Sequence, residues 1–167
     1  TLPLIHGTAF GFILPFGSAH WQVLAELANQ AEHHGVAEFR LAPHHGLLAI
    51  DAAPAFSAAV AALGFITDAD DPLLRVSACI GSDGCASGRM PSRRLAAELA
   101  SLVPPHASLH VSGCTKGCAH PRPADVTLVG LDGATGLVIR GRAGDTPAML
   151  LGETEIGSAV AQAFRQG

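Results

Sequence analysis

Residues 112–121, which read SGCTKGCAHP, place two cysteines, two glycines, a lysine and a histidine in one short stretch. The chain has four cysteines, and the other two, Cys79 and Cys85, lie in the stretch ACIGSDGCASG. The cysteines therefore form two close pairs, C-x5-C and C-x3-C, separated by 28 residues. A predicted strand precedes each pair, LLRVSA the first and SLHVS the second. If these two strands end side by side, their loops can present four sulfurs to one point.

Glycines are concentrated in both cysteine loops, at Gly81, Gly84, Gly88, Gly113 and Gly117. Glycine permits the unusual backbone angles and the close approach of amide groups that a loop wrapped around a cluster or a metal ion requires. Disulfides are not expected in a chain of this size without secretory marks. The four thiols suit a 4Fe-4S cluster or a structural zinc ion. Zinc loops usually space their thiols by two to four residues, so the wide C-x5-C pair favours the cluster and leaves zinc open.

The chain of 167 residues is long enough for one domain or two small ones, and its composition is poor in charge. Charged residues make up 14% of the chain, against roughly 25% in ordinary soluble domains, and the mean hydropathy is +0.34. We therefore expect one face to pack against another chain or domain. Because the sequence starts at Thr1, we expect a piece of a longer polypeptide. No apolar run is long enough for a membrane helix and no signal peptide is visible, so we expect a cytoplasmic protein without a membrane partner.

The charges are unevenly distributed along the chain. The net charge is −4, which argues against a nucleic-acid partner. Eight of the ten basic residues but four of the fourteen acidic ones lie between Arg75 and Arg142, so this window has a net charge of +4 and the remainder −8. The cysteines lie inside the basic window. Arginine pairs bidentately with carboxylates and phosphates, so we expect an anionic ligand near them.

The first part of the chain predicts the order β-α-β-β-α-β of a ferredoxin-like half-module. Strands are expected over residues 8–14, 36–42, 46–51 and 73–78. The first helix should begin after a Ser18 cap and end at Gly35, and the second should begin at Pro54 and end at Gly64. The apolar stripe of the first helix comprises Trp21, Leu24, Leu27, Ala28 and Ala31.

The second part, residues 73–167, predicts a mixed α/β module. A helix over residues 92–103 should bury Leu95, Leu99 and Leu102, and a strand over residues 108–112 leads into the second cysteine pair. Two apolar runs flank DGATG, which is a hairpin signal. The tail has Ile156, Val160 and Phe164 at helical spacing.

The stretches ACIGSDGCASG and HVSGCTKGCAHPRPADVTLVG resemble the cluster-binding module of the nitrite/sulfite reductase superfamily. The stretch ALGFITDADDPLLRVSAC is similar as well, so the resemblance covers nearly the whole chain. It implies an α+β fold, with a ferredoxin-like βαββαβ half-module in residues 1–72 and a nitrite/sulfite-reductase-like, 4Fe-4S cluster-binding α/β module in residues 73–167. It also implies that the cluster is bound by Cys79, Cys85, Cys114 and Cys118. In members with sirohaem, the last of these cysteines, here Cys118, also bridges to the haem iron.

Within this superfamily, GCTKGCAHP and GLVIRGRAGDTP are similar to the precorrin-3B synthase branch. The resemblance implies an oxygen-dependent monooxygenase of aerobic cobalamin biosynthesis, which hydroxylates precorrin-3A with dioxygen and forms a γ-lactone. The cofactors implied are the 4Fe-4S cluster and a mononuclear non-haem iron, with NADH as the indirect electron donor through an electron-donor protein. A sirohaem-dependent nitrite or sulfite reductase is the alternative, and a zinc-stabilised interaction module without catalysis is the second alternative.

The resemblance also implies a partner, because two such halves pair about a pseudo-twofold axis in this superfamily. The partner would be the missing N-terminal half of the same polypeptide or a second copy. A precorrin ring is fringed with carboxylates, so the cationic residues near the loops are candidates for binding it: Arg75, Arg89, Lys116, Arg122, Arg140 and Arg142. His120 follows the last cysteine and is the candidate catalytic residue, as a proton donor or an iron ligand. The other histidines, His110 among them, are expected to be structural or exposed.

Overall fold

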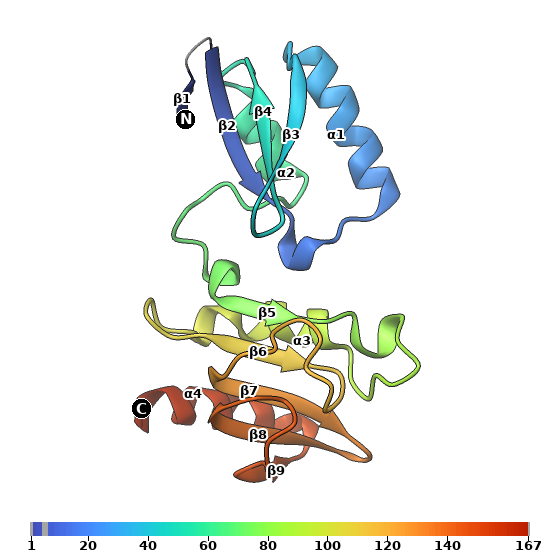
Figure 1. Cartoon of the computed structure of the whole chain (residues 1–167), viewed down its shortest axis with the longest axis vertical. Helices are drawn as coiled ribbons and strands as arrows, with labels where there is room; N and C mark the ends of the chain where they lie inside the picture. Colours follow the sequence, from blue (N-terminus) through green and yellow to red (C-terminus); the bar gives the residue numbers. More distant parts are fainter. Residues whose placement is uncertain (1, 5–6, 167) are drawn as a thin grey trace. The chain divides into compact units, whose positions relative to one another are not determined.

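The computed structural model describes residues 2–4 and 7–166. The chain divides into two compact units, Thr1–Asp71 and Pro72–Gly167, and each unit has its own sheet (Figure 1). The fold is therefore α+β with two sheets, as the sequence predicts.

The first unit is a four-stranded antiparallel sheet with two α-helices. The sheet order is β1-β2-β4-β3, so β2 and β4 are central and β3 forms an edge. The elements are β1 (Leu2–Leu4), β2 (Gly7–Ile13), the short 3-10 helix η1 (Pro15–Gly17), α1 (Trp21–His33), β3 (Glu38–Ala42), β4 (Gly46–Ile50) and α2 (Phe56–Ala62).

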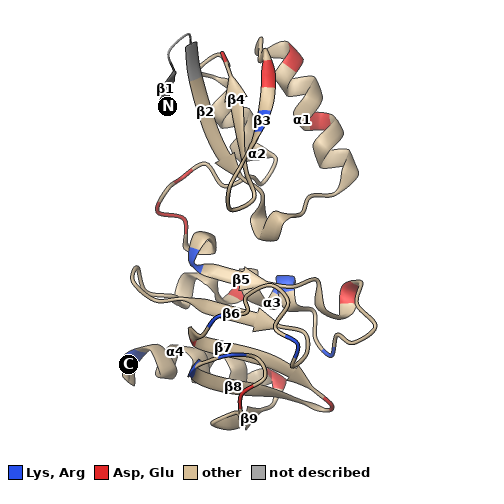
Figure 2. Cartoon of the chain, in the orientation of Figure 1, with Lys and Arg blue, Asp and Glu red and all other residues tan. Residues whose placement is uncertain are grey.

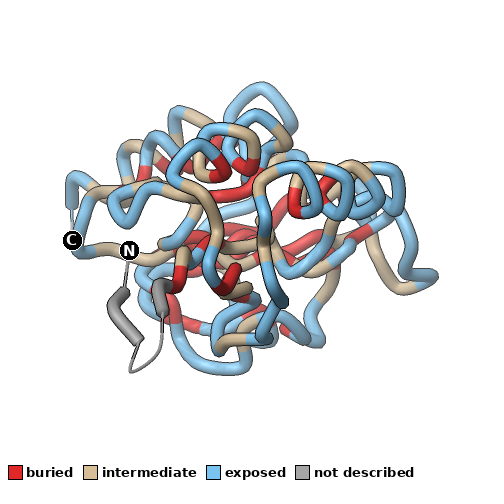
Figure 3. The backbone as a smooth tube through the Cα atoms, turned by 90° about the horizontal axis from the view of Figure 1, so that it is seen from above, coloured by how far each residue is buried: buried red, intermediate tan, exposed pale blue. Residues whose placement is uncertain are grey.

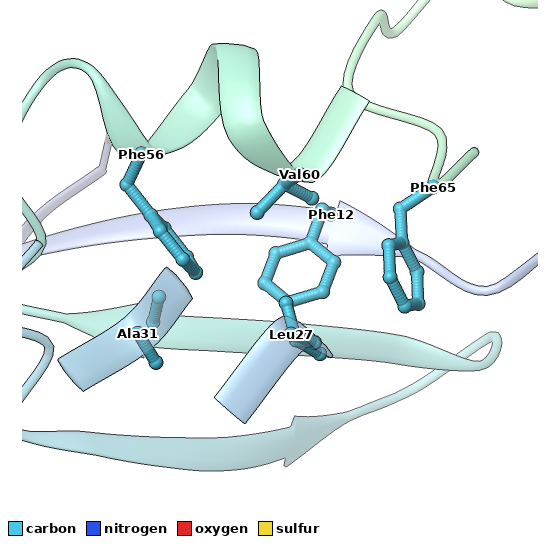
Figure 4. Close-up of a cluster of buried hydrophobic side chains, with 7 residues drawn as sticks. Phe12, Leu27, Ala31, Phe56, Val60 and Phe65 are labelled. Atoms are coloured by element: carbon cyan, nitrogen blue, oxygen red, sulfur yellow. The ribbon is translucent and has the colours of Figure 1, made fainter. Parts of the chain in front are cut away.

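The core of this unit lies between the two helices and the central strands. Phe12 on β2 contacts the rings of Phe56 on α2 and Phe65, with centroids 6.3 and 5.3 Å apart. Leu27 and Ala31 on α1 complete the cluster (Figure 4). Burial of these side chains is the main favourable term that holds the helices to the sheet.

Both helices end at the glycines that the sequence marks. Gly35 and Gly64 have φ values of +69° and +85°, in the left-handed region that glycine adopts at low cost. The amide of the residue after each glycine donates a hydrogen bond to a carbonyl of the preceding helix. For example, the Val36 amide donates to the Ala31 carbonyl at 2.9 Å. The start of α1 differs from the prediction, because its N-cap is His20 without a side-chain hydrogen bond, and Ser18 does not cap it.

The predicted apolar stripe of α1 is wrong in part. Trp21 and Leu24 are 68% and 43% exposed. The helix is rotated so that Leu27 and Ala31 face the core, with Val23 packed against the same cluster. Trp21, Leu24 and Ala28 therefore form a neighbouring stripe on the surface, which periodicity alone does not distinguish from the buried one.

The predicted sixth element of the ferredoxin-like half is also wrong. Residues 73–78 are not a strand of the first sheet: Pro72–Arg75 is the 3-10 helix η2, and β5 (Val76–Ala78) belongs to the second sheet. In the first sheet, the side of β2 away from β4 pairs with β1. At the C-terminal end of β2, Ile13 forms an antiparallel bridge with Ile66. The amide of each residue donates to the carbonyl of the other at 2.9 Å.

The second unit is a five-stranded mixed sheet in the order β5-β6-β7-β8-β9. Strands β5, β6 and β7 are parallel, and β8 and β9 continue antiparallel. Helix α3 packs on β5 and β6, and α4 packs on β7 and β8. After β5 the elements are η3 (Gly81–Asp83), α3 (Ser92–Leu99), η4 (Ala100–Leu102), β6 (Leu109–Ser112), β7 (Ala124–Leu131), β8 (Ala134–Gly141), β9 (Met149–Leu151), η5 (Glu153–Glu155) and α4 (Ile156–Gln166).

Burial in this unit is greatest in the middle of the sheet. All of β6 and most of β7 are buried. Figure 3 colours the backbone by burial, with the buried residues in red. The hairpin prediction is confirmed, because Asp132 and Gly133 connect β7 to β8 and the pair Leu131↔Ala134 closes the turn. The helix over residues 92–103 ends earlier than predicted as an α-helix and continues as η4, so that Leu102 is exposed.

Charge is also distributed unevenly in the structure. Figure 2 shows that the segments bearing lysine and arginine lie mainly in the second unit, where the cysteines are. Among the described residues, no helix has the length and apolar character needed to cross a membrane.

Replacing Phe12 should unfold the first unit more readily. Phe12 is 2% exposed, and Phe12→Ala would leave a cavity at the centre of the cluster, so we expect a loss of about 3–5 kcal/mol in the free energy of unfolding. Leu41→Ala is the control, because Leu41 is 90% exposed and its loss should change stability by less than about 0.5 kcal/mol. Denaturant unfolding measures both, and equal effects would contradict the assigned core.

Candidate functional site

The parallel pairing of β5 and β6 places the two cysteine loops next to each other. In the register, Ala78 pairs with Val111, so Cys79 follows the end of β5 and Cys114 lies just beyond β6. The carboxyl ends of parallel neighbours lie at the same edge of a sheet. The prediction that the two strand ends lie side by side is therefore confirmed.

Hydrogen bonds join the two loops directly. The Gly113 amide donates to Cys79 Sγ at 3.1 Å, and the Arg89 amide donates to the Gly113 carbonyl at 2.7 Å. Near the surface, Lys116 Nζ donates to Ser87 Oγ at 2.9 Å. Each of these contacts connects the C-x5-C loop or the residues just after it to the C-x3-C loop.

The first loop is tightly folded on itself and needs glycine at its centre. The Ser82 amide donates to the Met90 carbonyl at 2.9 Å, and the Cys85 amide donates to the Gly81 carbonyl at 3.0 Å. Gly81 has φ +64°, and a Cβ there would lie 2.3 Å from the Met90 carbonyl oxygen. A Cβ on Gly113 would lie 2.8 Å from the Gly81 Cα. The loops could not approach this closely with larger residues at these positions.

The second loop is held at both of its ends. Ser112 Oγ donates to the Cys114 carbonyl at 2.7 Å, and the His120 amide donates to the Gly117 carbonyl at 3.2 Å. Gly117 also lies beside the turn after β8, where a Cβ on it would be 3.4 Å from the Ala143 Cβ. The loop is therefore ordered by contacts within this unit.

All four cysteines are free, and their exposure differs within each pair. Cys79 and Cys114, nearest the strands, are half-buried, whereas Cys85 and Cys118 are exposed. Burial by itself would raise the pKa of the Cys79 thiol. Hydrogen bonds from the Gly113 backbone, the Ser92 side chain and the Gly81 backbone outweigh it, so the pKa is lowered. This environment favours the thiolate, which is the form that binds iron or zinc.

The donor set and the loop geometry fit an iron–sulfur cluster. An amide already points at one sulfur, and the glycines leave the backbone close to the thiols, which suits a group held by thiolates and backbone amides. Among the described residues, no three His, Cys, Asp or Glu side chains converge as ligands of one metal ion. Thiolates around a 4Fe-4S cluster bind separate irons, so a cluster does not require that convergence on a single point.

Two of the predicted cationic residues border a hollow beside Cys114. The hollow has a volume of ≈ 260 Å³, and Arg89, Lys116 and Asp132 line it. Arg89 Nε pairs with Asp132 Oδ1 at 2.6 Å, and the two side chains are 45% and 90% exposed. An anion could therefore replace this carboxylate at low cost, since exposed ion pairs contribute little to stability.

The other predicted arginines are more scattered. Arg75 precedes β5, at the opposite end of that strand from Cys79, and its guanidinium donates to the Val103 carbonyl at 3.3 Å. Arg142 lies in the turn after β8, next to Ala143, which is beside the second loop. Two more are exposed, Arg140 at the end of β8 and Arg122 after the second cysteine pair.

His110 is a residue whose place the sequence does not reveal. It lies on β6 and is fully buried, and neither ring nitrogen has a hydrogen-bond partner among the described residues. Its ring centroid is 5.6 Å from that of half-buried His120. Burial, and to a lesser degree the nearby His120, lowers the pKa of His110 to about 4. The candidate catalytic histidine therefore has a neutral histidine beneath it.

We expect His110 to make the second unit sensitive to acid. The folded chain keeps His110 neutral down to about pH 4, while the unfolded chain binds a proton near its ordinary pKa of 6.5. The free energy of unfolding should thus fall as pH drops from about 6.5 to about 4. His110→Leu should reduce this dependence, and His106→Leu is the control for removing an exposed imidazole. Denaturant unfolding across that range measures it, and an unchanged slope in His110→Leu would contradict the burial.

Comparison with known proteins places the chain among relatives. A scan against protein-family models finds no match. A precorrin-3B synthase from Sinorhizobium sp is 34% identical over an alignment of 177 positions, which covers 98% of this chain and 39% of that protein. The chain thus spans well under half the length of this relative.

Two solved structures share the fold. The Mycobacterium tuberculosis NirA protein matches 99% of this chain and 38% of its own length, with a TM-score of 0.70 and 19% identity. Dissimilatory sulfite reductase I matches 72% of this chain and 32% of its own length, with a TM-score of 0.51 and 10% identity. The chain is therefore homologous to a precorrin-3B synthase over 98% of its own length, and its fold resembles those of NirA and dissimilatory sulfite reductase I.

Proposed function

We propose that this chain is the cluster-binding part of an iron–sulfur oxidoreductase of the precorrin-3B synthase type. The complete protein would hydroxylate precorrin-3A with dioxygen and form a γ-lactone, as a step of aerobic cobalamin biosynthesis. One observation carries the proposal: two cysteine loops meet at the ends of adjacent parallel strands, in a chain homologous to precorrin-3B synthase over 98% of its length.

The ligands of the 4Fe-4S cluster would be Cys79, Cys85, Cys114 and Cys118. When bound, the cluster would supply single electrons to the reaction, drawn from NADH through an electron-donor protein. The protein's part is to hold the thiolates in place, and Gly81 and Gly113 do so by allowing the loops to touch. The mononuclear iron is proposed for the complete protein and is not assigned to residues of this chain.

Cationic side chains around the loops would bind the carboxylates of the tetrapyrrole. Arg89 and Lys116 are the strongest candidates, because both line the hollow beside Cys114. Arg122, Arg140 and Arg142 are further candidates as exposed cations beyond the second loop and at the end of β8. For Arg75 we propose a structural role, since its guanidinium holds the Val103 carbonyl.

His120 would donate or accept a proton at the edge of the site. It follows the second loop, and its backbone amide is fixed by the Gly117 carbonyl, so its position depends on the fold of that loop. His110 beneath it is buried and uncharged near neutral pH, so this neighbour adds no positive charge beside His120. Such an arrangement suits a group that changes protonation during a reaction.

The partner would be the missing N-terminal half of the same polypeptide or a second copy of this chain. The first unit exposes an apolar stripe with Trp21 and Leu24 on α1, and exposed Phe39 and Leu41 on the edge strand β3. Uncovered apolar side chains next to an unpaired strand edge suit an interface. Light scattering of this chain, alone and mixed with the rest of the complete protein, would show which partner it binds.

A sirohaem-dependent nitrite or sulfite reductase is the alternative, because the fold is shared with NirA and dissimilatory sulfite reductase I. The visible spectrum of the complete protein, purified in air, separates the two functions. Intense haem bands would establish the reductase. A broad shoulder from thiolate–iron charge transfer would support the synthase.

Cys118→Ser should abolish assembly of an intact 4Fe-4S cluster, since a hydroxyl is a poor substitute for a thiolate on iron. Iron content and the electron paramagnetic resonance (EPR) signal after anaerobic reconstitution measure the loss. Ala119→Ser is the matched control, because it adds the same side chain at the next, exposed position and removes no thiol. Full cluster occupancy in Cys118→Ser would contradict this ligand set.

A further inference from the structure

Ser92, the first residue of α3, lies directly behind Cys79. Ser92 is 0% exposed, and its Oγ is 3.7 Å from Cys79 Sγ in hydrogen-bond geometry. A buried serine hydroxyl next to a half-buried thiol is therefore built into the interior side of the candidate cluster site.

Backbone from both loops encloses this hydroxyl. A Cβ on Gly81 would lie 2.6 Å from Ser92 Oγ, and a Cβ on Gly113 would lie 3.2 Å from it. The same Cβ on Gly113 would lie 3.4 Å from Cys79 Sγ. Because glycine occupies both places, the serine oxygen and the sulfur sit together without a side chain between them.

The hydroxyl proton of Ser92 has two possible acceptors. In the free protein, Ser92 Oγ donates to the Met90 carbonyl at 3.4 Å, which is long for an O–H···O bond, and the Cys79 thiol can donate to Ser92 Oγ. A thiolate bound to iron has no proton and can only accept. The Ser92 hydroxyl could then rotate about its Cβ–Oγ bond and donate its proton to the sulfur. This hydrogen bond would be strengthened by the negative charge on the thiolate.

We propose that Ser92 is a positioning residue that raises the reduction potential of the cluster by donating a hydrogen bond to Cys79 Sγ. This rests on the proposed function, because it requires the cluster. A donor to a ligand sulfur stabilises the reduced cluster, which carries one more negative charge, over the oxidised one. The hydroxyl adds to the Gly113 amide, which already donates to the same sulfur at 3.1 Å.

Ser112 provides a matched comparison within the same site. It is also a buried serine, and it lies at the end of β6, but its hydroxyl donates to the Cys114 carbonyl oxygen at 2.7 Å and not to a sulfur. Removing either hydroxyl is the same chemical change in a similar environment. A difference between the two variants therefore isolates the contact with the cluster ligand.

The test compares Ser92→Ala, Ser112→Ala and the wild-type chain after anaerobic reconstitution with iron and sulfide. Iron and acid-labile sulfide give the occupancy, and a redox titration followed by EPR gives the potential. We expect Ser92→Ala to keep the cluster and to have a lower, more negative potential than wild type. Ser112→Ala should shift the potential less, and Ser92→Thr, which keeps a hydroxyl, should remain closer to wild type than Ser92→Ala.

Two outcomes would overturn the proposal, and they differ in what else they overturn. A fully occupied Ser92→Ala with the wild-type potential would remove the role of Ser92 and leave the cluster assignment standing. Failure of the wild-type chain to assemble a cluster would overturn both. If Ser92→Ala does not assemble, the pair Ser92→Thr and Ser92→Val decides, since the two side chains have nearly the same shape: the threonine variant must have the higher potential, and equal potentials would overturn the role.

Discussion

The hydrogen bond from the Gly113 amide to Cys79 Sγ joins the two cysteine loops, and it depends on the parallel pairing of β5 with β6. That pairing brings residues separated by more than thirty positions to one edge of the sheet, and the absence of side chains on Gly81 and Gly113 lets the two backbones touch. The helix α3 begins immediately behind them, and its first residue fills the space next to the sulfur. The strand order of the second unit's sheet therefore brings the two loops together.

Much of the fold follows from short-range signals in the sequence. The helices end where Gly35 and Gly64 allow a left-handed turn, and Asp132-Gly133 sets the β7–β8 hairpin. The features that the sequence predicts wrongly depend on contacts between residues that are distant in the chain. A strand cannot be assigned to one of two sheets from its own residues, so the βαββαβ pattern counts residues 73–78 with the first sheet although β5 belongs to the second. Periodicity likewise shows that α1 is apolar on more than one side, but not which side faces the core.

The difference between short-range signals and long-range contacts applies to the candidate site as well. The cysteine spacing and the glycines predict two loops at adjacent strand ends, and the structure agrees. The sequence gives no sign of Ser92 or of His110, because each acquires its role from a neighbour distant in the chain, Cys79 for one and His120 for the other. Arg75 is four residues from Cys79 in the sequence, yet the two residues lie at opposite ends of β5.

We propose that the four cysteines hold one iron–sulfur cluster in a protein homologous to precorrin-3B synthase. The most direct measurement is the iron and acid-labile sulfide content of the chain purified and kept without oxygen. We expect about four irons and about four sulfides per chain, since each of the four thiolates binds one iron of the cluster. Zinc in place of iron, or iron without labile sulfide, would contradict it.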